Sequence, residues 1–180
     1  MINYKKLANI FKNSSQFLIW RKGEDEYLVT NTYLIIRLDQ QTFNKMKAKY
    51  SSYKNTPYVK ELGIDEFVSI YNKSITDQEK PNLEEVLDDS GAKKAIVTKL
   101  ILNQGDKNLL YVVDGEFGMI SKKYFDLFGY DKKYKTVNTR SPLMVYDVEK
   151  LIAAVMPIRN ESLQNLDGIS LLKAQLDGDQ

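Results

Sequence analysis

Apolar residues follow the same order of spacings near both ends of the chain. Each half reads as one helix, with apolar residues three and four positions apart, followed by three runs typical of strands. The predicted elements of the first half are 4–12, 16–21, 26–30 and 32–38. Those of the second half are 122–128, 134–138, 143–147 and 151–158. Two such units side by side predict an α+β fold, in which a curved antiparallel sheet lies over two helices.

The strand pair at 143–147 and 151–158 carries the strongest signal. Pro142 can begin a strand and Pro157 can end one, because neither position needs a backbone N–H for the ladder. The second strand is apolar nearly throughout, which predicts that both of its faces are covered. Asp39 is a candidate N-cap for a helix over 40–50.

Between the halves the pattern changes. Runs 94–103 and 108–113 indicate a hairpin, and 117–120 indicates a short extended piece that leads to Ser121, a candidate N-cap. The stretch 51–91 is weaker, and short helices over 64–71 and 81–87 are predicted there. We therefore expect a domain over 1–159 with an insertion at 52–92 and a C-terminal tail at 160–180.

Charge is distributed unevenly along the chain, although the net charge is only +2. Lys and Arg outnumber Asp and Glu by 9 to 4 in residues 1–51 and by 12 to 7 in residues 93–159. The balance is reversed in 52–92, with 4 against 9, and in the tail, with 1 against 4. This pattern favours one cationic face made by the two halves, with the acidic insertion elsewhere; ordinary solvated surfaces are the alternative.

The amino-acid composition limits the catalytic groups and metal ligands that the protein can use. The chain has 180 residues, 0 Cys and 0 His, so it lacks thiolates, the usual general base and the commonest metal ligand. It has no glycine-rich phosphate loop, and the carboxylate pairs Asp88–Asp89 and Asp114–Glu116 do not have the spacing of a metal site. We expect a protein that is not an enzyme and has no cofactor or metal. No apolar run is long enough to span a membrane, and a cytoplasmic location is expected.

One part of the chain resembles a known family. The run Ser141-Pro142-Leu143, Asp147 and Ala154-Val155-Met156-Pro157-Ile158-Arg159 resembles the C-terminal end of bacterial sliding clamps, the β subunit of the replicative polymerase. The segment 119–128 looks like the clamp strand that enters a helix. These motifs cover 117–159, and the repeated order of elements agrees over most of 1–159. A chain with room for one domain is more similar to the single-domain clamp-like proteins of phages and mobile elements.

The resemblance implies a role for the lysines. In the clamp fold the helices line the DNA hole and contact phosphates without reading bases. It assigns that role to Lys5, Lys6, Lys12, Lys122 and Lys123. Lys132, Lys133 and Lys135 are candidates to extend the track. Binding of this kind is non-specific and depends steeply on salt, whereas lysine-rich solvated helices are the plainer interpretation.

The resemblance also implies a groove for partner peptides at Met156 and Pro157, where strand-end core packing is the alternative. The tail segment 168–172 faintly resembles the peptides that clamps bind and is a candidate occupant of its own or a neighbour's groove. An amphipathic surface helix is the plainer interpretation of the tail.

The acidic insertion is a candidate partner surface, because clustered carboxylates attract a basic partner or imitate DNA phosphates. Its residues are Glu61, Asp65, Glu66, Asp77, Glu79, Glu84, Glu85, Asp88 and Asp89. A solvated loop is the alternative. Three functions follow: a DNA-associated scaffold, an inhibitor of a host nucleic-acid enzyme or defence nuclease, and a small carboxylate hydrolase. Open sheet edges would favour a homo-oligomer.

Overall fold

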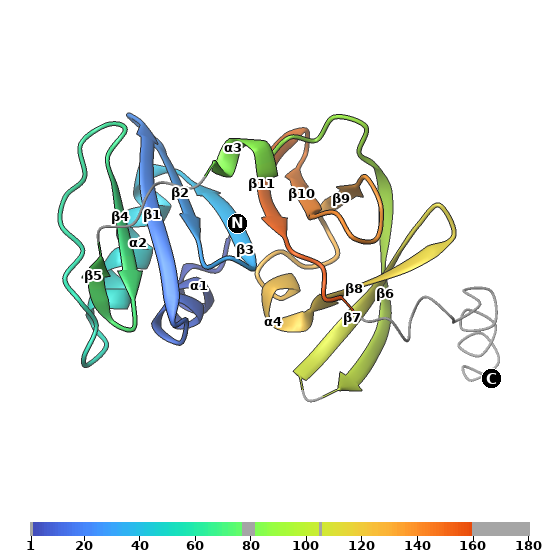
Figure 1. Ribbon diagram of the computed structural model, residues 1–180, viewed down its shortest axis with the longest axis horizontal. Helices are drawn as coiled ribbons and strands as arrows, with labels where there is room; N and C mark the ends of the chain where they lie inside the picture. Colours follow the sequence, from blue (N-terminus) through green and yellow to red (C-terminus); the bar gives the residue numbers. More distant parts are fainter. Residues whose placement is uncertain (1, 77–81, 105, 160–180) are drawn as a thin grey trace.

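The structure is a computed structural model that describes residues 2–76, 82–104 and 106–159. Within these residues the chain forms four helices and eleven strands (Figure 1). The helices are α1 Tyr4–Lys12, α2 Gln40–Ser51, α3 Leu83–Val86 and α4 Lys122–Phe125. The strands are β1 Gln16–Gly23, β2 Glu26–Thr30, β3 Leu34–Leu38, β4 Phe67–Tyr71, β5 Ser74–Thr76, β6 Lys93–Gln104, β7 Asp106–Val113, β8 Glu116–Ser121, β9 Lys133–Thr136, β10 Leu143–Asp147 and β11 Lys150–Val155.

All eleven strands belong to one antiparallel sheet with the order β5-β4-β1-β2-β3-β11-β10-β9-β6-β7-β8. Strands β3 and β11 meet near its middle, where Leu34 pairs with Val155 and Ile36 with Ala153. The six strands around this junction therefore run β1-β2-β3 on one side and β11-β10-β9 on the other. The fold is thus α+β with a large antiparallel sheet.

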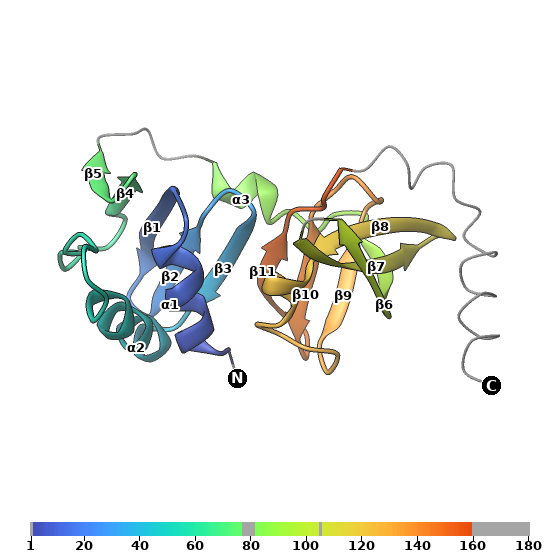
Figure 2. The same cartoon turned by 90° about the horizontal axis from the view of Figure 1, so that it is seen from below.

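Three helices cover one face of the sheet. α1 buries Leu7 and Phe11, α2 buries Phe43 and Met46, and α4 buries Phe125, all in the largest apolar cluster of the protein. Figures 1 and 2 show α1 and α2 beside the strands of the first half, and Figure 1 shows α4 beside those of the second. This face therefore carries α2 in addition to the two helices of the predicted repeat.

The other face of the central strands has its own apolar cluster, covered by α3. Leu18, Trp20 and Leu28 pack there with Leu83, and Ala154 of β11 joins them. Alternate residues of β11 thus enter opposite clusters, and the prediction that this strand is covered on both faces is confirmed.

The predicted helix over 64–71 is wrong. Residues Phe67–Tyr71 form β4, which pairs with β1 and turns into β5 through Asn72 and Lys73, both with positive φ. Val68 and Ile70 enter the cluster under the helices, and the β-branched, aromatic composition of the segment fits a half-covered strand. The 52–92 segment therefore extends the sheet, and its α3 closes the second face.

Several other elements differ in length from the prediction. α4 ends at Phe125, and Gly129, at φ +80°, closes the following turn with its N–H donating to the Phe125 carbonyl at 3.0 Å. Ser121 has extended backbone at the N-cap position, but its side chain makes no capping hydrogen bond. β9 stops at Thr136, and Pro157 follows the end of β11. The tail at 160–180 lies outside the described residues.

Candidate nucleic-acid interface

The helices on the two faces of the sheet carry opposite charges. α1, α2 and α4 contain eight lysines and no acidic residue. The lysines are Lys5, Lys6, Lys12, Lys45, Lys47, Lys49, Lys122 and Lys123. α3, on the other face, contains Glu84 and Glu85 and no basic residue. The helices on the two faces therefore differ in charge, and we call the side formed by α1, α2 and α4 the lysine face.

Local packing turns the α1 lysines outward. Asn3 caps the helix by accepting the Lys6 backbone N–H at 3.1 Å, which fixes where its first turn begins. Leu7 and Phe11 then face the sheet and are buried, so Lys5 and Lys6 on the opposite side are exposed. The spacing of apolar residues therefore determines both the packing of α1 and the direction of its charges.

Tyr53 connects the cationic ends of α1 and α2. The Lys12 Nζ atom lies 4.5 Å from the centroid of its ring, and the Lys49 Nζ atom lies 4.9 Å from it. Each ammonium gains from the negative face of the aromatic ring. One tyrosine thus holds a lysine from each of two helices on the lysine face.

A second connection joins α1 to α4. The Lys6 Nζ atom donates to the backbone carbonyl of Asp126 at 3.5 Å, and Lys122 forms an ion pair with the Asp126 carboxylate at 2.6 Å. Lys123 lies over the ring of Tyr124 at 4.9 Å. The five helix lysines proposed from the sequence are thus distributed over two neighbouring helices, with one carboxylate between them.

The α2 lysines were not among the predicted site residues. Lys45 is exposed, and Lys49 contributes to the Tyr53 contact. Lys47 differs, because its side chain is 16% exposed and pairs with Glu61 at 3.3 Å. The signal that could have identified Lys45 and Lys49 is their outward spacing on the predicted helix 40–50, the same feature that marks α1.

Lys132 is held inside a small ion-pair network. Its side chain is 11% exposed and contacts Asp131 at 2.8 Å and Asp147 at 3.2 Å. Hydrogen bonds to Asp131 and then to Asp147 raise the pKa of Lys132, and the hydrogen bond from Lys132 lowers the pKa of Asp131. Its charge is used to fix the turn before β9 against the end of β10.

Strand alternation places Lys133 and Lys135 on the α3 side. Tyr134, between them, enters the cluster under the helices. The Lys135 Nζ atom lies 4.7 Å from the ring centroid of Tyr146, which belongs to the α3-side cluster. Lys133 pairs with Glu149, and this contact lowers the pKa of the Glu149 carboxyl. The structure therefore does not bring Lys133 and Lys135 together with the α1 and α4 lysines.

Met156 and Pro157 are half-buried beyond the end of β11. Met156 packs against the α3-side cluster, and its N–H donates to the Tyr33 carbonyl at 2.9 Å. Ile158 then donates its N–H to the Met119 carbonyl on β8 at 2.7 Å. This segment therefore crosses from β3 to β8 and connects the middle of the sheet with its end.

The predicted acidic surface is divided between different places. Asp65 accepts the Trp20 indole N–H at 2.9 Å, and Glu84 pairs with Lys22 at 2.5 Å, so both are attached to β1 on the α3 side. The remaining contacts are Glu61 with Lys47, Glu66 with the Gly63 N–H, Glu85 with the Asn82 side chain, Asp88 with Ser90, and Asp89 with the Tyr146 hydroxyl. Hydrogen bonds from Ser90 lower the pKa of Asp88. Asp77 and Glu79 lie outside the described residues.

Over 2–76, 82–104 and 106–159, no group of three Asp or Glu side chains is arranged to hold a metal ion. In the same part of the chain, no helix is long and apolar enough to cross a membrane.

Among known proteins, the similarity found is to a solved structure and not to a family model or a curated sequence. No family model matches the sequence, and no curated protein matches it. The structure is similar to a crystal structure described as a putative DNA polymerase III beta subunit from Eubacterium rectale, with 14% sequence identity and a TM-score of 0.40. The match covers 88% of this chain and 64% of that one. At this TM-score and identity the likeness does not establish a function.

Proposed function

We propose that this chain is a non-enzymatic, clamp-like scaffold that holds duplex DNA by its phosphates on the lysine face. The observation that carries the proposal is the charge of the helices: eight lysines and no carboxylate on α1, α2 and α4, with α1 connected to its neighbours at Tyr53 and Asp126. Lys5, Lys6, Lys12, Lys122 and Lys123 make the contacts, and Lys49 joins them.

The chemistry of lysine determines the kind of binding. Each ammonium that neutralises a phosphate releases a condensed cation, so affinity falls steeply with salt. Lysine is a flexible point charge without the planar fork with which arginine reads guanine, and no arginine lies on α1, α2 or α4. The lysine face therefore binds the backbone and is indifferent to base sequence.

The order of strands supports the clamp-like arrangement. β1-β2-β3 and β11-β10-β9 meet at β3 and β11, and each set of three follows a helix on the same face. β5 and β8 form the two ends of the sheet, and pairing of copies along the parts of these edges that the Ile158–Met119 hydrogen bond leaves open would complete a larger assembly. A DNA-processing partner at Met156 and Pro157, the phage or mobile-element origin and the cytoplasmic location remain part of this proposal.

A second candidate function rests on the opposite side. α3 presents Glu84, which pairs with Lys22, and Glu85 on the face opposite the lysine face, and a basic host enzyme or defence nuclease is the matching partner for an inhibitor. An inhibitor co-elutes with its target and ignores free DNA, whereas the scaffold retains circular DNA. The two candidates are thereby separated in one chromatographic experiment.

Charge reversal on the lysine face tests the scaffold. The triple variant K5E/K6E/K123E is expected to bind a labelled 30-base-pair duplex at least ~100-fold more weakly than the unaltered chain, from about 1 kcal/mol for each ammonium–phosphate contact. Fluorescence anisotropy at low salt measures both affinities, and circular dichroism checks that the variant is folded.

The matched control is K94E/K133E/K135E, which changes the net charge equally on the α3 side, where Lys94 pairs across the ladder with Lys135. It is expected to weaken binding less than ~10-fold, through long-range charge alone. An equal loss in both triple variants, or no loss in the first, contradicts a DNA-binding role for the lysine face.

A further inference from the structure

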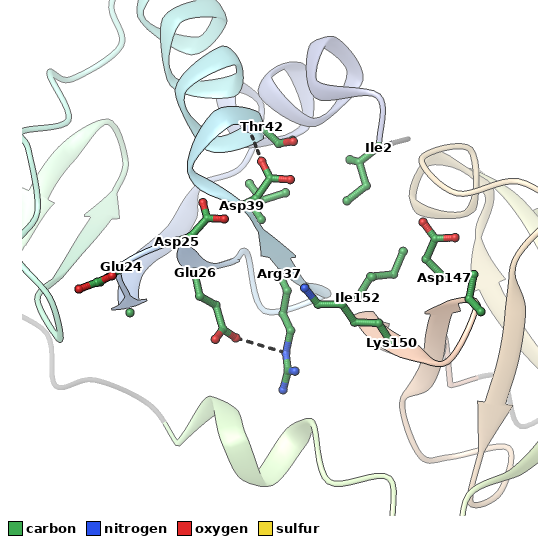
Figure 3. A pocket seen from close by; sticks show the side chains of 13 residues that line it. Ile2, Glu24, Asp25, Glu26, Arg37, Asp39, Thr42, Asp147, Lys150 and Ile152 are labelled. Atoms are coloured by element: carbon green, nitrogen blue, oxygen red, sulfur yellow. Dashed lines mark hydrogen bonds and ion pairs between the residues drawn. The ribbon is translucent and has the colours of Figure 1, made fainter.

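A cleft lies where two central strands of the sheet separate (Figure 3). β3 continues to Leu38 and β11 begins at Lys150, but their pairing ends at Ile36 and Ala153. Beyond that pair the two strands form a fork that opens into a cleft of about 730 Å³. This volume is in the range of sites that bind small ligands or short peptide segments.

The fork leaves strand edges without partners. Leu38 pairs on one side with Tyr27 of β2, and Leu151 pairs on one side with Tyr146 of β10. Among the described strands, nothing pairs with the opposite edges of Arg37–Leu38 and Leu151–Ile152, and Arg37, Leu38 and Ile152 line the cleft. Open strand edges of this kind accept an extended segment by main-chain hydrogen bonds.

Acidic side chains dominate the lining. Five carboxylates line the cleft against two cationic groups, Arg37 and Lys150. The carboxylates are Glu24, Asp25, Glu26, Asp39 and Asp147. Figure 3 shows Glu26 beside Arg37, and Asp39 beside Thr42 at the start of α2. The excess of negative charge selects a cationic ligand.

Arg37 favours a ligand that carries hydrogen-bond acceptors as well as positive charge. Its Nε atom is buried and has no hydrogen-bond partner, and the Glu26 carboxylate lies 3.8 Å away, too far for a hydrogen bond. Because the Nε atom is enclosed by protein, a ligand would meet the Arg37 guanidinium at its terminal nitrogens, and a ligand that brings hydrogen-bond acceptors would be favoured. Main-chain carbonyl groups of a peptide supply such acceptors.

We infer that this cleft binds an extended peptide segment rich in Lys or Arg, added as a strand in the fork between β3 and β11. Its carbonyl groups meet Arg37 and the open strand edges, and its cationic side chains meet the carboxylates. Its apolar side chains contact Leu38 and Ile152. No lysine of the lysine face lines the site, although Thr42 of α2 does, and peptide binding there does not depend on DNA binding.

Charge argues against two other occupants. Residues 160–180 of this chain carry four acidic and one basic side chain, and DNA is negative throughout. The net negative charge of the cleft repels both. The partner is therefore a basic segment of another protein.

The test uses the full chain and an array of synthetic eight-residue peptides. In one set Lys or Arg alternates with Val, Ile or Thr; in a matched set Glu replaces the basic residues. Basic peptides are expected to bind, and their affinity, measured by fluorescence anisotropy, is expected to fall at least ~10-fold in E24Q/E26Q. The control E61Q/E85Q, with the same charge change outside the cleft, is expected to leave binding unchanged.

Hydrogen exchange provides the second measurement. Bound peptide is expected to slow the exchange of amides in Arg37–Leu38 and Leu151–Ile152. The inference is overturned if no basic peptide binds, if the Glu peptides bind as well, if E24Q/E26Q binds as the unaltered chain does, or if binding leaves these amides unprotected.

Discussion

Replacing Gly118 with Ala is expected to destabilise the protein by about 3 kcal/mol, because the added methyl group meets a buried ring. Gly118 on β8 pairs directly with Tyr111 on β7. A Cβ atom at Gly118 would lie 2.1 Å from the Tyr111 Cζ atom. The Tyr111 ring is fully buried, and its hydroxyl donates to the Thr139 carbonyl at 3.1 Å, so the ring cannot move aside without losing that hydrogen bond.

Urea unfolding followed by circular dichroism measures this effect. G23A is the matched control, because a Cβ atom there meets only Glu26 Cβ at 4.0 Å, and a change within about 0.5 kcal/mol is expected. In a Tyr111→Val background the clash disappears, so G118A should cost less than ~1 kcal/mol there. Equal stabilities of G118A and G23A would contradict the close approach of ring and backbone.

Replacing Asn31 with Ala is expected to cost about 3 kcal/mol, because it removes four hydrogen bonds from a buried site. The Asn31 Nδ2 group donates to the Ser14 hydroxyl at 3.0 Å and to the Tyr124 hydroxyl at 3.2 Å. Its Oδ1 atom accepts the N–H groups of Tyr33 and Leu34 at 3.3 and 3.1 Å. One side chain thus connects the end of α1, the turn before β3 and α4.

N31D separates the two groups of contacts, since it keeps the acceptor for the turn and removes the donor to Ser14 and Tyr124. An intermediate loss of stability in thermal unfolding is expected. Asn9, exposed on α1, serves as the control, and N9A should change stability by less than ~0.5 kcal/mol. If N31D were as stable as the unaltered chain, the side-chain connection between α1 and α4 would contribute nothing.

Elements with strong local signals could be predicted from the sequence. The strand 143–147 and the helix that begins after Asp39 are found where they were predicted. Asp39 caps that helix by accepting the Thr42 N–H at 2.6 Å. In both places a turn or cap residue and the apolar spacing indicate the same boundaries.

The strand β4 could not be predicted, because its signal is not local. Val68 and Ile70 are two positions apart, as in a strand, but the surrounding residues 64–71 fit a short helix equally well. Pairing with β1, which is distant in sequence, decides the outcome. Tertiary pairing overrides a weak local pattern of this kind.

The positions of some lysines could be predicted from the sequence, whereas those of others depend on the tertiary structure. Helical spacing was sufficient to identify Lys5 and Lys6 as exposed, and it applied equally to Lys45. The position of Lys132 depends on Asp147, which β10 brings beside it, and the side on which Lys135 lies depends on the order of strands in the sheet. Residue spacing does not contain this information.

The dependence of duplex affinity on salt tests the central claim most directly. For the unaltered chain the logarithm of the binding constant is expected to fall linearly with the logarithm of NaCl concentration, equally for duplexes of different sequence. Neutralising Lys5, Lys6, Lys12, Lys122 and Lys123 to Gln is expected to make that slope shallower by about 0.9 for each lysine that contacts a phosphate. An unchanged slope, or binding that depends on base sequence, would contradict a lysine face that holds the DNA backbone.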